Sequence, residues 1–295
     1  MPRSLLGISL SFLAVVFGVF TGILVKQLGT EVNIVTALFY RFLFSLPILF
    51  LFAICVRGHQ FLQINQRRIM LFRVIFGCCG ITFWFLSIRN MPLGMATALF
   101  QSSVIFVTLL SPIFLCERVG LYRWSAVLTG LSGVLIITDP LAGDMSWHFL
   151  YGIGAALSGA VLSLLLRQLS KGDAPASVAV WYNMCGFAVL SVIALILPEQ
   201  LYSIRQAVMV DLILLGVIGA GLQIVLTTAY RYSDAIVVAS MRYLQMPVSG
   251  LVGYFLFAEV MSTGEIVGAL IIISSCVVIA WRELVRSREV NQPGI

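Results

Sequence analysis

Charged side chains are scarce in this chain of 295 residues. Asp, Glu, Lys and Arg together make up 10% of the sequence, whereas a soluble domain carries about 25%. Hydrophobic residues reach 60%, and the mean hydropathy is +1.05. A chain with so few charges cannot cover its own surface in water, but a lipid bilayer removes that requirement. The composition therefore excludes an ordinary water-soluble domain and predicts an integral membrane protein.

The motifs of several enzyme classes are also missing. The sequence contains no GxxxxGK(S/T) phosphate-binding loop, no HExxH zinc motif and no GxSxG nucleophile elbow. These absences argue against an ATP-driven pump, a zinc protease and a serine hydrolase. The six cysteines are scattered without a CxxC pair and are interpreted as small packing residues. We therefore expect no enzymatic activity, no cofactor and no metal site.

Ten apolar stretches divide the chain. Each is long enough to cross about 30 Å of hydrocarbon as a helix, and helices are expected because lipid offers backbone groups no partners. The predicted spans are residues 4–25, 34–56, 69–88, 93–116, 121–138, 149–166, 177–197, 211–230, 235–258 and 264–281. The sequence thus predicts an all-α integral membrane fold. Pro112 and Pro247 are its expected flex points.

Basic residues are distributed unequally between the two sides of the predicted bundle. With the N-terminus in the cytoplasm, thirteen Lys and Arg residues, Arg73 among them, fall in inner segments and three fall in outer segments. The positive-inside rule then predicts cytoplasmic N- and C-termini. The net charge of +6 is explained by loops that face anionic lipid, so no nucleic-acid partner is predicted. We expect a multi-pass protein of a bacterial inner membrane.

The chain resembles itself at an offset of 142 residues. The segments that align at this offset are Phe39-Tyr40-Arg41 with Trp181-Tyr182-Asn183, Arg89 with Arg231, and Glu117 with Glu259. The repeated unit has five spans, an odd number, so the second copy must enter the membrane from the opposite side. This predicts two inverted five-helix repeats, residues 1–140 and 141–295, that form one transmembrane domain. Inverted repeats suit alternating access to a site near the midplane.

Four segments carry a recognisable family pattern: Tyr40–Ser45, Met91–Leu99, Leu115–Arg118 and Phe257–Glu259. They resemble the drug/metabolite transporter superfamily, specifically its ten-helix EamA-type branch, and the likeness covers essentially the whole chain. The resemblance implies a secondary carrier with a central cavity. Within the branch, Arg242-Tyr243-Leu244 resembles the S-adenosylmethionine uptake carriers of intracellular bacteria. Gln245 follows where that pattern tends to continue with a carboxylate, so the substrate stays open.

Acidic residues are absent from the middle of every predicted span. All twelve Asp and Glu residues and both His residues lie in loops or at span ends. This disfavours a proton-coupled exporter of cationic drugs, because proton relays need titratable groups at depth. Arg41 and Arg242 lie roughly 10 Å deep at 1.5 Å per residue. Each either faces a wet cavity or extends to the interface; in a cavity, both would favour an anionic or zwitterionic substrate.

Other polar and aromatic residues complete the candidate site. Amides in mid-span need partners and aromatic faces can hold a substrate cation, although interface anchoring or packing explains any one of these residues equally well. The predicted substrate-binding residues are Arg242, Arg41, Tyr243, Gln245, Gln101, Asn183, Tyr40, Tyr182, Trp84 and Gln223. Glu117 and Glu259 are interpreted as helix-end or gate residues.

The leading prediction is a secondary active or facilitative transporter of a small anionic or zwitterionic metabolite, working by alternating access. S-adenosylmethionine or a related metabolite is the substrate that the resemblance implies. The alternative is an exporter of amino acids or aromatic compounds, which predicts a mostly aromatic cavity with Arg41 and Arg242 outside it. A scaffold or channel would show no saturable flux, and an intramembrane enzyme would need a His or carboxylate at depth. The expected partners are the lipid bilayer and the small-molecule substrate.

Overall fold

The computed structural model describes residues 3–29, 31–115, 121–138, 147–196, 206–232, 238, 242 and 244–291. Helices and short turns account for these residues, and no strand occurs among them. The helices are α1 (Arg3–Leu28), α2 (Ile34–Arg57), the 3₁₀ turn η1 (Gly58–Gln60), α3 (Arg67–Asn90), α4 (Leu93–Gln101), α5 (Ser103–Leu115), α6 (Leu121–Thr138), α7 (Phe149–Gly172), α8 (Pro175–Ile196), α9 (Gln206–Tyr232), α11 (Gln245–Phe257) and α12 (Thr263–Asn291). The predicted all-α fold is confirmed.

The helices have the length and surface that a bilayer requires. Seven of the described segments are long and apolar enough to cross a membrane, and one of these joins α4 to α5. Counted with α6, α11 and α12, they match the ten predicted spans. Large apolar side chains point outward: Leu195 is 81% exposed and Phe255 is 76% exposed. Such a surface is stable against lipid chains but not in water.

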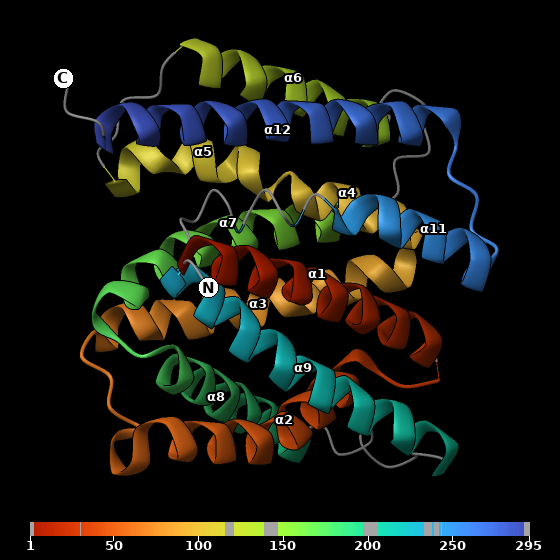
Figure 1. The fold of residues 1–295 in the computed structure, drawn as a ribbon. Helices are drawn as coiled ribbons and strands as arrows, with labels where there is room; N and C mark the ends of the chain where they lie inside the picture. Colours follow the sequence, from red (N-terminus) through yellow and green to blue (C-terminus); the bar gives the residue numbers. More distant parts are fainter. Residues whose placement is uncertain are drawn as a thin grey trace.

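Helix pairs repeat across the two halves of the chain. Helix α1 packs along α9, and α3 packs along α7. Since α1 and α7 open the two halves and α3 and α9 are their third helices, one pairing is the image of the other. Helix α2 packs against its equivalent α8, and α6 packs against its equivalent α12. Figure 1 shows these two pairs at opposite edges of the bundle, with α1, α3, α7 and α9 between them. The predicted fold of two inverted five-helix repeats is confirmed.

The fourth crossing differs from the single helix predicted over residues 93–116. Helix α4 ends at Gln101 and α5 begins at Ser103. The Leu99 carbonyl accepts both the Ser102 N–H (3.1 Å) and the Ser102 hydroxyl (2.6 Å), which tightens the turn. In the second half α11 begins at Gln245, directly after Leu244, which is the equivalent of Ser102 at the 142-residue offset. The interruption lies at Ser102 and not at the expected flex point Pro112, which lies inside α5.

At each end of the bundle a carboxylate accepts hydrogen bonds from backbone N–H groups at the start of a helix. Asp173 accepts hydrogen bonds from the N–H groups of Asn65 (2.7 Å) and Gln66 (3.2 Å), just before α3. At the other end of α3, Glu259 accepts the N–H of Leu93 (2.7 Å), the first residue of α4. A negative charge is favourable at a helix start because the first N–H groups have no partner within the helix. Glu117, the other expected gate residue, lies outside the described residues.

Candidate functional site

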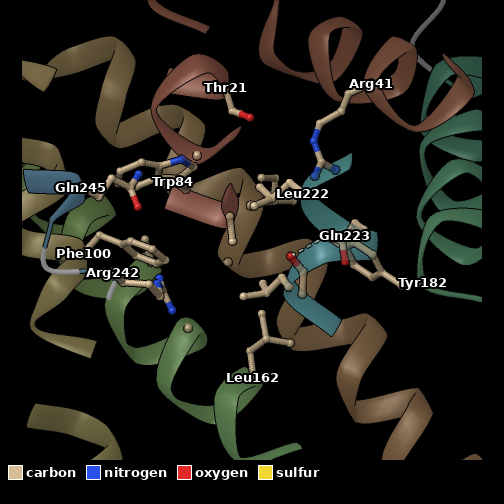
Figure 2. Close-up of a pocket in the computed structure, with 18 of the residues that line it drawn as sticks. Thr21, Arg41, Trp84, Phe100, Leu162, Tyr182, Leu222, Gln223, Arg242 and Gln245 are labelled. Carbon is tan, nitrogen blue, oxygen red and sulfur yellow. Dashed lines mark hydrogen bonds between the residues drawn. The ribbon is translucent and has the colours of Figure 1, made fainter. Parts of the chain in front are cut away.

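A cavity of about 130 Å³ lies between the central helices. Its walls come from α1, α2, α3, α4, α7, α8, α9 and α11, so both repeats contribute. Its polar and aromatic lining residues are Thr21, Arg41, Arg73, Trp84, Phe100, Tyr182, Gln223, Arg242 and Gln245. We refer to this space as the central cavity, and Figure 2 shows it from close by.

Two arginines are buried at one end of the central cavity. Arg41 on α2 and Arg73 on α3 are each 1% exposed. Arg73 donates from Nη2 to the amide oxygen of Gln223 (3.1 Å), and its Cζ lies 4.0 Å from the ring centroid of Tyr182. The Nε and Nη1 atoms of both arginines have no hydrogen-bond partner. Buried donors are normally satisfied, so these four nitrogens are available to an acceptor that enters the cavity.

Gly77 makes room for this end of the cavity. It lies one helical turn after Arg73 on α3, and a Cβ atom built there would lie 2.6 Å from Cε2 of Tyr182 and would also collide with Nη1 of Arg73. The Tyr182 hydroxyl donates to the Gly77 carbonyl at 3.2 Å. A glycine at position 77 therefore lets the guanidinium group and the phenol ring lie against the helix backbone.

Aromatic side chains form the other end of the central cavity. The ring centroids of Trp84 and Phe100 are 4.6 Å apart with an angle of 38° between their planes. Cζ of Arg242 lies 4.6 Å from the Phe100 centroid, on the face of the ring. Figure 2 shows Trp84, Phe100, Arg242 and Gln245 together on one side of the cavity, and Arg41, Tyr182 and Gln223 on the other.

The chemistry of the central cavity is that of binding. No Asp, Glu or His occurs among the described residues that line it. In the part of the chain that the structure describes, no three His, Cys, Asp or Glu side chains are grouped as metal ligands. The lining therefore offers fixed positive charge, amides and aromatic faces, but no pair of groups for acid–base catalysis.

Six of the ten residues predicted from the sequence line the central cavity: Arg41, Trp84, Tyr182, Gln223, Arg242 and Gln245. The other described candidates lie beside it. Gln101 donates from its amide to the Arg242 carbonyl, which links the interrupted crossings of the two repeats. Asn183 is fully buried and donates to the Ala179 carbonyl of its own helix (2.8 Å). Tyr40 stacks on Phe44 with centroids 5.7 Å apart. Tyr243 lies outside the described residues.

Arg73 lines the cavity although the sequence pattern did not indicate it as a site residue. Its place soon after Arg67 and Arg68 indicated a basic inner loop. The structure starts α3 at Arg67, which places Arg73 almost two helical turns inside the helix. The available signal was its position within the predicted span 69–88, with apolar residues on both sides.

A ten-helix bundle of two inverted repeats around a central cavity is the architecture of a membrane transporter. The sequence pattern described as the EamA-like transporter family matches residues 5–139 and again residues 146–281. The chain belongs to this family, within the drug/metabolite transporter superfamily, as the sequence predicted. It is a multi-pass membrane transporter of a small metabolite and not an enzyme.

Individual relatives carry three different transport names. A "Riboflavin transporter" of Vibrio cholerae is 33% identical over 78% of this chain and 76% of its own length. An "S-adenosylmethionine uptake transporter" of Rickettsia bellii is 27% identical over 94% of each chain. A "Pseudopaline exporter CntI" of Pseudomonas aeruginosa is 26% identical over 72% and 74%. One crystal structure aligns with a TM-score of 0.66 and 14% identity over 94% of this chain and 96% of that chain, which shows a shared fold.

Proposed function

We propose that the protein is a secondary active or facilitative transporter that carries a small anionic or zwitterionic metabolite by alternating access. The observation that supports this most directly is the pair of buried arginines, Arg41 and Arg73, whose unpaired nitrogens line the cavity. Buried cations without a counter-charge are strongly unfavourable. A substrate that brings a carboxylate or phosphate would remove this penalty through charge-assisted hydrogen bonds.

S-adenosylmethionine is the candidate substrate that we place first. It offers a carboxylate to the arginines and an adenine ring to Trp84 and Phe100, and its sulfonium cation suits an aromatic face. The Rickettsia bellii relative that is named for its uptake aligns over nearly the whole chain. Riboflavin, in the name of the Vibrio cholerae relative, offers a planar ring without an anionic group, so it would leave Arg41 and Arg73 without a counter-charge.

An exporter of amino acids or aromatic compounds is the second candidate. The close pair Trp84 and Phe100 favours it, and one relative is named as an exporter. If the protein were such an exporter, Arg41 and Arg242 would be expected to lie outside the cavity, but both line it. The placement of the two arginines therefore supports the first candidate.

We also propose that residues 1–140 and 141–295 are the two repeats of one transmembrane domain in a bacterial inner membrane, with both termini in the cytoplasm. The charge distribution supports this orientation after Arg73 is reassigned to the cavity, since twelve basic residues (13 − 1) remain on the inner side against three on the outer side. Fusions of a reporter that is active only in the periplasm should be silent at both termini. Activity at either terminus would contradict the orientation.

Solute counterflow in proteoliposomes tests the transport proposal. Purified protein is first screened by thermal stabilisation against S-adenosylmethionine, riboflavin, amino acids, nucleotides and organic acids, and the hits are then assayed for counterflow. We expect saturable flux of an anionic or zwitterionic hit that Arg73→Gln abolishes. Arg68→Gln is the matched control, because Arg68 is on the same helix but exposed. Saturable flux only of compounds that carry no carboxylate or phosphate, or no saturable flux with any compound, would overturn the proposal.

A further inference from the structure

The central cavity has two chemically different ends. The cationic end consists of Arg41, Arg73, Tyr182 and Gln223; the aromatic end consists of Trp84, Phe100, Arg242 and Gln245. We infer that the transported substrate is a planar aromatic or heteroaromatic ring joined through a short linker to a carboxylate or phosphate. The ring binds at the aromatic end and the anion binds between Arg41 and Arg73. This inference rests on the proposed transport function and narrows its substrate class.

The cationic end is incomplete without an anion. Arg41 and Arg73 carry the same charge and line the same end of the cavity, and both interact with the Tyr182 side chain. The Gln223 amide oxygen accepts a hydrogen bond from Nη2 of Arg73. The Nε and Nη1 atoms of each arginine, which have no hydrogen-bond partner, are charged donors that can each bind an oxygen of a carboxylate or phosphate. A single anion between the two groups would satisfy donors of both and reduce their repulsion.

The geometry of the aromatic end favours a flat group. Arg242 lies on one face of Phe100, at 4.6 Å from the centroid, and Trp84 lies against the same ring at a tilt of 38°. Aromatic side chains of this kind are the surfaces on which a planar ligand stacks. The buried amide of Gln245 lies at this end and can donate to or accept from a heteroatom of the ring.

Small residues keep the aromatic end open. A Cβ atom at Gly159 would lie 3.0 Å from Cε2 of Phe100, and one at Gly18 would lie 3.1 Å from Nε2 of Gln245. Both glycines line the cavity. Apolar side chains, among them Leu162 and Leu222, lie between the two ends (Figure 2). A ligand with a ring and an anion separated by a few apolar bonds therefore matches the order of surfaces along the cavity.

Matched ligands separate the contribution of the ring to the binding affinity from that of the anion. Indole-3-acetate carries both a ring and a carboxylate, indole-3-acetamide has the same shape without the charge, and acetate has the anion alone. Adenosine 5′-monophosphate, adenosine and ribose 5-phosphate form the equivalent phosphate series. Dissociation constants are measured by isothermal titration of the detergent-purified full chain. We expect the ring-plus-anion member of at least one series to bind about 10- to 100-fold more tightly than the other two. The series that shows this difference identifies the anion as carboxylate or phosphate.

Two variants assign the ends of the ligand to the ends of the cavity. Arg73→Gln should bring the affinity for the anionic ligand down to that of its neutral analogue, whereas Arg73→Lys should keep part of the difference. Phe100→Leu should weaken binding of the anionic ligand and of its neutral analogue by a similar factor, about 3- to 10-fold. The ratio of the two affinities should therefore stay the same. The same ligands are tested for counterflow with the parent protein.

Failure of the inference can be told apart from failure of the transport proposal. If the protein exchanges ring-free anions as well as ring-bearing ones, or if Arg73→Gln weakens the charged and neutral ligands equally, the two-ended substrate is wrong while transport stands. If the parent protein shows no saturable counterflow with any compound of the wider panel, the transport proposal itself fails, and the inference fails with it.

Discussion

The ammonium nitrogen of Lys26 lies 2.5 Å from Oε1 of Glu259, and this ion pair joins the two halves of the chain. Lys26, in the last turn of α1, also donates to the carbonyl oxygens of Ile88 (3.1 Å) and Met91 (2.6 Å). The other carboxylate oxygen of Glu259 accepts the N–H of Leu93 (2.7 Å). Ends of α1, α3, α4 and α11 are therefore held together at one end of the bundle, which we call the Lys26 end.

Glu259→Gln is expected to loosen the Lys26 end without unfolding the protein. The amide oxygen can still accept the Leu93 N–H, but the charge attraction to Lys26 is lost. The pair is only 17% and 15% exposed, so its loss should destabilise this end by more than the ~1 kcal/mol of an exposed pair and less than the ~3–5 kcal/mol of a fully buried one. In a cysteine-free background with Thr21→Cys in the cavity lining, an impermeant thiol reagent added at the Lys26 end should react faster.

Lys26→Met should raise the same labelling rate, and the double variant should add little because both changes remove one interaction. Glu265→Gln is the matched control, because Glu265 accepts only the Ser262 N–H in the first turn of α12 among the hydrogen bonds that the structure describes for its side chain. Equal labelling rates in the parent protein, Glu259→Gln and Lys26→Met would show that other contacts close this end.

Gly77→Ala should remove anion binding while the fold is kept. The new methyl group would displace the Arg73 guanidinium and the Tyr182 ring, since its position lies 2.6 Å from Cε2 of Tyr182. We expect a loss of affinity of at least about tenfold for the anionic ligand, corresponding to roughly 1.4 kcal/mol. Gly250→Ala is the control, because a Cβ there meets no atom closer than 4.0 Å. Titration and thermal unfolding are measured on both, and unchanged affinity in Gly77→Ala would contradict the placement of Arg73.

Gln223→Glu should harm binding of an anion more than Gln223→Leu does. The carboxylate would pair with Arg73 Nη2, which now donates to the Gln223 oxygen, and would compete with the anionic substrate for the same charge. Gln223→Leu only removes an acceptor that positions Arg73. Affinities for indole-3-acetate and its neutral amide distinguish the two effects. The reverse order of the variants would show that Gln223 acts through shape and not through charge.

Asn183→Leu should leave transport nearly unchanged. Asn183 was a candidate from the sequence, but its amide donates to the Ala179 carbonyl one turn away, and its side-chain oxygen is buried without a partner. Replacing it with an apolar group of similar size removes an unsatisfied buried acceptor, so stability should be equal or higher by up to about 1–3 kcal/mol. Counterflow and the unfolding temperature are the measurements. A loss of flux with normal folding would place Asn183 in the transport path.

The sequence pointed to residues that line the central cavity where a single residue carried its own signal. Arg41 and Arg242 were visible because a charge inside a long apolar run is rare and has few explanations. Arg73 was hidden because it follows Arg67 and Arg68 near a span boundary, where basic residues usually belong to loops. Ser102 gave no signal either, since serine occurs within membrane helices and commonly donates its hydroxyl to a carbonyl of the preceding turn, as Ser102 does to Leu99.

The sequence by itself determined that this is a membrane protein of ten helices in two inverted repeats, and to which family it belongs. Hydrophobicity and repeat offsets are properties of local windows and of alignment, so they need no knowledge of contacts. Only the tertiary structure decided which arginine side chains face the cavity and where an ion pair joins the two halves of the chain. Arg73 and Gln223 are 150 residues apart in the chain, and Lys26 and Glu259 come from opposite halves. Whether two such residues meet depends on how the helices rotate and pack against distant segments. A local window of sequence does not contain that information.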